Sequence, residues 1–144
     1  MTPVLLGRWQ TRTFVLWTIG LLVTFLVSLA YDGPNDIFFE VLFYVWLFGL
    51  GWDVVYHFLQ QLKWDRDWPP FAQWAATAWE GMFISLVIGY VGLPGIEKGL
   101  FGETGTLDRF IAHYTLVWLF TFFWLQGPMR ALFPFWRFHG GRIV

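Results

Sequence analysis

The sequence predicts an all-α, polytopic membrane protein with four transmembrane helices and both chain ends on the cytoplasmic side. Hydrophobic residues make up 57% of the 144 residues and charged residues only 13%, whereas about a quarter of the residues in a soluble domain are charged. The apolar residues also lie in long blocks rather than in short amphipathic periods. These observations together predict a single transmembrane helical domain over residues 1–144, with no separate soluble domain.

Four apolar blocks define the expected helices. They cover residues 14–30, 37–60, 71–93 and 110–126. The first block is free of charged residues and spans about 25 Å as a helix at ~1.5 Å per residue, which is just enough to cross a bilayer. We therefore expect it to be retained as a membrane helix rather than removed as a signal peptide.

Turn-forming residues separate the blocks. The segment 31–36 has the composition of a tight hairpin, and Pro70 suits the first turn of the third helix. Pro94 and Gly95 are expected to end that helix, and residues 96–109 then form a glycine-rich loop. After Gly127, the tail 129–138 mixes Arg, Phe, Trp and Leu, a composition typical of a short segment at the membrane surface.

The distribution of Lys and Arg predicts the orientation. Seven of these residues flank the predicted inner side, namely Arg8, Arg12, Lys63, Arg66, Arg130, Arg137 and Arg142. The opposite loops contain only Lys98 and Arg109. Because cytoplasmic loops carry the excess of positive charge, this count places both termini and the 61–70 loop in the cytoplasm of a bacterial cell, with the chain in its inner membrane.

Three ionisable residues inside the apolar blocks are candidates for a proton or cation site. Each costs at least ~2.5 kcal/mol at the centre of a bilayer, so Asp53, His57 and Glu80 need an explanation. Asp53 and His57 are four residues apart and share one helix face. Glu80 on the next helix is expected at a similar depth, within the inner half of the membrane.

Three interpretations of these residues compete. In the first, Asp53 and His57 pair with each other or with Lys63 and Arg66, and Glu80 hydrogen-bonds across a helix contact. In the second, a titrating His57 and a desolvated Glu80 form a proton or cation pathway. A metal site is less well supported, because two carboxylates and one imidazole lack a fourth ligand.

His113 is expected elsewhere, in the first turn of the fourth helix near the outer surface. One interpretation is a surface pair with Asp108 or Asp36. The other is axial ligation of a haem or a chlorophyll-type pigment, which makes His113 a candidate ligand. The sequence does not identify a cofactor.

A row of small and polar residues predicts a close helix contact on the third helix. Gln73, Thr77, Gly81, Ser85 and Gly89 recur every four residues, and small residues let neighbouring backbones approach in a membrane. This small-residue seam is either an intramolecular contact or an oligomer contact. Because a monomer has few other ways to bury three charges, we favour a homo-oligomer or a larger complex.

The most distinctive polar stretch is the interfacial loop, which contains Trp64, Asp65, Arg66, Asp67 and Trp68. Alternating charges between tryptophans indicate an anchored interfacial turn, or alternatively a docking epitope for a partner subunit. Together with residues 51–57, the loop resembles a segment of uncharacterised bacterial integral membrane proteins. The resemblance covers roughly residues 51–70; it implies a bacterial cell membrane and no particular activity.

Composition also limits the function. The absence of cysteine excludes thiol redox chemistry, disulfides and thiolate metal sites. We find no nucleophile constellation, phosphate-binding loop or complete metal set, and a net charge of −1 gives no reason to expect nucleic acid. The preferred hypothesis is a non-catalytic membrane subunit or accessory protein that packs against itself or other subunits in the lipid bilayer. A small proton-coupled or cation-conducting protein comes second, a pigment- or haem-binding subunit third.

Overall fold

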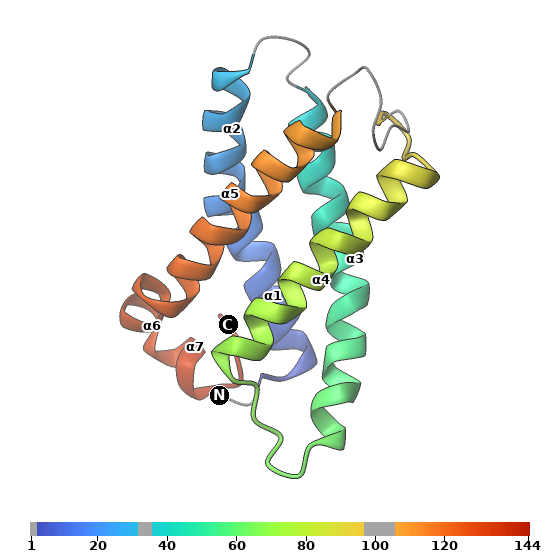
Figure 1. The fold of residues 1–144 in the computed structure, drawn as a ribbon. Coiled ribbons are helices and arrows are strands. Elements are labelled where there is room, and N and C mark those ends of the chain that lie inside the picture. Colours follow the sequence, from blue (N-terminus) through green and yellow to red (C-terminus); the bar gives the residue numbers. More distant parts are fainter. Residues whose placement is uncertain (1–2, 32–35, 97–105) are drawn as a thin grey trace.

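The structure, a computed structural model, describes residues 3–31, 36–96 and 106–144 (Figure 1). Within these ranges it is helical and contains no strand, which confirms the all-α part of the predicted fold class. Most of the predicted 31–36 turn and of the 96–109 loop lies outside the described residues. Both ends of the chain lie near the same end of the molecule as the connection between the second and third long helices (Figure 1).

The first long helix begins much earlier than predicted. It consists of α1 (Leu5–Val15), a π-helical turn over Leu16–Gly20 and α2 (Leu21–Ala30), which follow one another without a break. The predicted start at Phe14 is wrong because it was placed where the apolar block begins, whereas the helix continues through a polar segment. As a result, Arg8 and Arg12 lie on a helix rather than in an N-terminal arm.

The second and third long helices are α3 (Asp36–Leu62) and α4 (Pro70–Tyr90). Pro70 occupies the first turn of α4, as predicted, where its missing N–H leaves no helical bond unmade. The predicted helix end at Leu93 is too late. Gly92 has a φ of 77° and donates its N–H back to the Val87 carbonyl at 2.9 Å, so the left-handed glycine ends the helix before the predicted Pro94.

The fourth long helix, α5 (Thr106–Gln126), also starts earlier than the predicted Phe110 and ends where predicted. Two short helices follow, α6 (Pro128–Leu132) and α7 (Pro134–Phe138), and each has a proline in its first turn.

The chain after α7 folds back onto α1. The Gly140 carbonyl accepts the Val4 N–H at 2.9 Å, and the Gly141 carbonyl accepts the Thr11 hydroxyl at 2.8 Å. A side chain at Gly7 would overlap the Gly140 carbonyl, so glycine is required for this close approach. The C-terminal segment thereby becomes part of the wall around α1.

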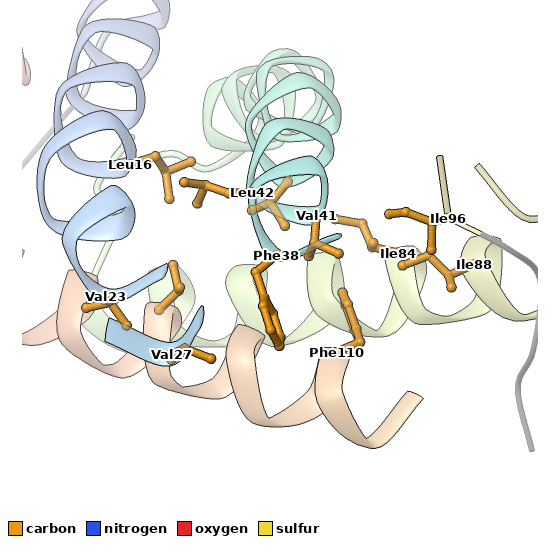
Figure 2. Close-up of a cluster of buried hydrophobic side chains, with 12 residues drawn as sticks. Leu16, Val23, Val27, Phe38, Val41, Leu42, Ile84, Ile88, Ile96 and Phe110 are labelled. Carbon is orange, nitrogen blue, oxygen red and sulfur yellow. The ribbon is translucent and has the colours of Figure 1, made fainter. Parts of the chain in front are cut away.

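The larger apolar core lies in the half of the molecule away from the chain ends (Figure 1), and its side chains are shown in Figure 2. Side chains from α2, α3, α4 and α5 meet there, among them the buried Val27, Phe38, Ile88 and Phe110. The buried polar side chains of this half are Thr24, Ser28 and His113, whereas the buried carboxylates Asp53 and Glu80 lie nearer the chain ends. The apolar packing and the charged cluster thus divide the interior between them.

Candidate functional site

A single arginine joins the two buried carboxylates. Arg12 Nε and Nη2 donate to the two Asp53 oxygens at 2.8 and 2.9 Å, and its Nη1 and Nη2 donate to the two Glu80 oxygens at 2.8 and 2.9 Å. The side chains are 14%, 6% and 1% exposed, respectively. Four of the five guanidinium N–H groups and all four carboxylate oxygens are therefore used, an arrangement that the planar guanidinium fork favours. We call these three residues the ion triad.

Glycine on α3 makes room for this arrangement. Gly49 lies one helical turn before Asp53, so the two residues share a helix face. A Cβ atom at Gly49 would overlap the Arg12 guanidinium. The side chain of Arg12 can therefore cross from α1 over the α3 backbone and reach Glu80 on α4. The triad links three helices that are distant in the sequence.

A second arginine lies beside the triad, one turn earlier on α1. Arg8 Nη2 donates to Gln60 Oε1 at 2.8 Å, and the Arg8 guanidinium carbon lies 4.6 Å from the centre of the Trp68 ring. Gln60 in turn donates its amide to the Arg66 carbonyl at 2.8 Å. These contacts fix the end of α3 and the interfacial loop against α1, and a cation over an indole face adds to them.

Two tyrosines attach the neighbouring helices to the backbone of α4. The Tyr56 hydroxyl on α3 donates to the Ala76 carbonyl at 3.1 Å, and the Tyr114 hydroxyl on α5 donates to the Thr77 carbonyl at 2.6 Å. Both carbonyls lie about one turn before Glu80, so the tyrosines bracket the triad from two sides.

His57 has no hydrogen bond with the triad. Its Nε2 lies 3.1 Å from the Gln61 side-chain nitrogen, and the ring is only partly buried. The expected pairing of Asp53 with His57, Lys63 or Arg66 is thus replaced by pairing with Arg12, since the gap over Gly49 admits that guanidinium. In the described part of the chain, no cluster of three or more His, Asp or Glu side chains could hold a metal ion.

His113 is buried instead of lying at a surface. It is 1% exposed, its Nε2 is 2.8 Å from the Thr24 hydroxyl, and its ring packs against Phe38 at 5.4 Å. The expected surface pair with Asp108 or Asp36 is therefore wrong. The reason is that α5 begins at Thr106, so His113 lies in its second turn and faces α2 and α3. Its proposed role as an axial ligand stays a prediction.

The small-residue seam faces α5 over its first half. A Cβ atom at Gly81 would overlap the Tyr114 ring, Thr77 contributes the carbonyl bonded by Tyr114, and Gln73 accepts a bond from Gln126 at 3.2 Å. Further along, the Ser85 hydroxyl bonds to the Met82 carbonyl within α4. The first half of the seam is therefore an intramolecular contact with α5.

The interfacial loop is ordered by local bonds. Lys63 lies 3.6 Å from Asp65 and donates to the Asp67 carbonyl at 3.1 Å, while Arg66 adopts a left-handed φ of 50°. Trp64 is 98% exposed, whereas Trp68 contacts Arg8 and the Tyr56 ring. Trp68 therefore anchors the loop to the rest of the molecule, whereas Trp64 points away from it.

A cavity of about 160 Å³ adjoins the triad. Its wall includes Arg8 and Arg12 from α1, Glu80 from α4, Trp118 from α5 and Arg130 from α6. The sequence did not identify Arg8, Arg12 or Gln60 as site residues. The sequence does contain one indication of their role. Arg8 and Arg12 are four residues apart and share a helix face if the helix begins before them.

Comparisons with protein-family models, with curated proteins and with solved structures gave no match for this chain. No family is identified.

Proposed function

We propose that the chain is a non-catalytic, four-span integral membrane protein that serves as a structural or accessory subunit. The observation that supports this most is an inverted distribution of polarity, with the ion triad inside and apolar side chains outside. In water such an arrangement would expose a large apolar surface, whereas in lipid the apolar exterior is favourable and the charged groups face the interior and pair with one another, as charged residues in membrane spans do.

Every long helix exposes large apolar side chains along its length. The set includes Leu22, Phe25 and Leu29 on α2, Phe43, Leu47 and Phe58 on α3, Trp79, Met82 and Leu86 on α4, and Ile111, Phe120 and Phe123 on α5. No single face is favoured, as expected for a four-helix bundle surrounded by lipid. A soluble protein seldom leaves so many apolar side chains on all sides.

The helix lengths agree with four spans. Two segments, Leu5–Ala30 and Asp36–Leu62, are long and apolar enough to cross a membrane by themselves. Helices α4 and α5 have 21 residues each, which corresponds to about 31 Å at ~1.5 Å per residue, close to the ~30 Å hydrocarbon thickness. Their lower hydropathy reflects residues such as Gln73, Glu80 and His113, whose side chains are turned inward.

The triad supports a structural role better than a proton or cation pathway. All four carboxylate oxygens of Asp53 and Glu80 accept bonds from Arg12, so no free carboxylate faces a passing ion. His57 does not join them. A guanidinium also remains protonated under physiological conditions, and it opposes the entry of a cation into the cluster.

The subunit role is the remaining part of the proposal. Since Arg12 satisfies the buried charges within one chain, charge burial no longer argues for a homo-oligomer. The exposed aromatic side chains of α4, including Trp74 at 43% and Trp79 at 48% exposure, are better candidates for contact with a second copy or with other membrane subunits. Light scattering on the purified protein should then report more than one chain or a stable partner, and a lone monomer at all concentrations would refute this part.

Topology can be tested by cysteine labelling, because the natural chain contains no cysteine. Single variants Trp64→Cys and Val144→Cys should react with a membrane-impermeant maleimide only from the cytoplasmic face. Glu103→Cys, in the loop predicted on the other side, should react only from outside. Labelling of all three from one face would contradict four spans.

A flux assay separates the two leading functions. Liposomes containing the protein should show no more proton or alkali-cation permeability than protein-free liposomes between about pH 5 and 8, the range in which histidine titrates. A permeability that depends on Glu80 and is lost in Glu80→Gln would overturn the structural proposal in favour of conduction.

A further inference from the structure

The cavity beside the ion triad contains hydrogen-bond donors that have no acceptor. Arg8 Nε and Trp118 Nε1 are buried and lack a partner among the described residues. The Arg130 side chain also makes no hydrogen bond or ion pair with the part of the chain that the structure describes. Buried polar groups are nearly always bonded to protein, water or a ligand, so the N–H groups of Arg8 and Trp118 call for an acceptor in the cavity.

None of the acceptors that line the cavity bonds to these N–H groups in the structure. Asp53 and Glu80 also line the cavity, but their four oxygens take the N–H groups of Arg12. Positive charges also outnumber negative ones, since three arginines and two carboxylates line the cavity. The site therefore has an excess of one positive charge and spare donors, a combination that selects an anion.

Apolar and aromatic side chains make up much of the rest of the wall, beside polar ones such as Thr121 and Gln126. Val117, Trp118 and Leu125 of α5 and Trp136 of α7 contribute to it. The volume of about 160 Å³ is close to that of an engineered apolar cavity of ~150 Å³ that binds benzene. A body the size of one aromatic ring, or a lipid headgroup, fits this space.

We propose that this cavity binds an amphiphilic anion, whose carboxylate or phosphate takes the unused N–H groups of Arg8 and Trp118 and is balanced by Arg130, and whose apolar part packs against α5. Such an oxyanion can come from a soluble aromatic acid or from the headgroup of an anionic lipid. This site is separate from the subunit role proposed above and does not depend on it.

Two pairs of probes distinguish the sources, measured as shifts in the thermal unfolding of the full chain in neutral detergent. Benzoate should stabilise the protein in a saturable manner and benzamide should not, if a soluble acid fits. Phosphatidylglycerol should stabilise it more than phosphatidylcholine if a lipid headgroup fits. Either result, or both together, supports an oxyanion site.

Variants then locate the site. Arg130→Gln should weaken binding of the effective probe about tenfold, since a bond to a charged group contributes roughly that factor. Trp118→Phe keeps the ring and removes the N–H, and it should weaken binding about fivefold. Arg137→Gln is the matched control, because it removes the same charge from α7 at a residue outside the cavity wall, and it should leave the affinity unchanged.

The proposal fails if neither anion is preferred over its neutral counterpart, which would mean that water alone satisfies the donors. It also fails if Arg137→Gln weakens binding as much as Arg130→Gln, because the anion would then respond only to overall charge.

Discussion

Replacing Arg12 by glutamine tests whether the ion triad holds the helices together. The substitution removes the charge and most of the four N–H bonds, and it leaves Asp53 and Glu80 buried without a cation. Breaking a buried ion pair by removing one partner costs about 3 to 5 kcal/mol, because the other charge stays uncompensated. We therefore expect the free energy of unfolding to fall by about that amount, or two to three and a half powers of ten in the unfolding equilibrium.

The carboxylates should respond differently. With Asp53 and Glu80 ionised, the triad carries one excess negative charge, so Glu80→Gln leaves a balanced pair of Arg12 and Asp53. The glutamine oxygen can still accept a bond from Arg12, and we expect a loss of about 1 kcal/mol or less. In an Arg12→Gln background, Glu80→Gln should be stabilising, because it removes one of the two uncompensated charges.

Reversible unfolding in mixed micelles, followed by the fluorescence of the 11 tryptophans, gives these free energies. Arg142→Gln is the control, since Arg142 is exposed in the C-terminal segment and its loss should cost no more than about 0.5 kcal/mol. If Arg12→Gln costs less than about 1 kcal/mol, the magnitude of a surface ion pair, the triad does not hold the fold, and the reasoning is refuted.

Two further substitutions probe contacts between specific helices. Gly81→Leu should lower the free energy of unfolding by about 1 to 3 kcal/mol, because the new side chain would overlap Tyr114. Gly51→Leu is the control and should have a small effect, because nothing lies within 4 Å of a Cβ atom at Gly51. If both substitutions lower the free energy of unfolding equally, there is no close contact at Gly81. Thr24→Val should cost about 1 to 3 kcal/mol, because it leaves buried His113 Nε2 without its partner, whereas Thr121→Val removes a hydroxyl bonded only within its own helix and should cost less in the same assay.

The sequence predicted the all-α class and the approximate helices because each long helix contains a long apolar block. It did not predict the helix ends, since hydropathy measures how apolar a segment is and not whether the segment is helical. Leu5–Thr13 is polar yet helical, and α4 stops at a left-handed Gly92 although the apolar residues Val91 and Leu93 continue the block.

The buried carboxylates were predictable, but their partner was not. Asp53 and Glu80 were identifiable by the cost of charge in an apolar block. Arg12 was counted as a loop charge instead, because the helix that carries it was expected to begin at Phe14. Pairing across three helices also depends on Gly49, and the space that this glycine leaves becomes visible only when α1 and α3 are packed together.

The corrected position of Arg12 changes the basis of the orientation argument without reversing it. With Arg8 and Arg12 assigned to α1, the count of Lys and Arg on the predicted inner side falls from seven to five, still against Lys98 and Arg109. The proposed orientation therefore does not need the two α1 arginines. In the proposed topology Arg12 would lie near the inner end of the first span, where a long side chain can keep its charge at the interface while α1 is alone in the bilayer. We infer that the guanidinium leaves the interface only when α3 and α4 bring Asp53 and Glu80 to it, so that helix association, rather than insertion, buries the charge.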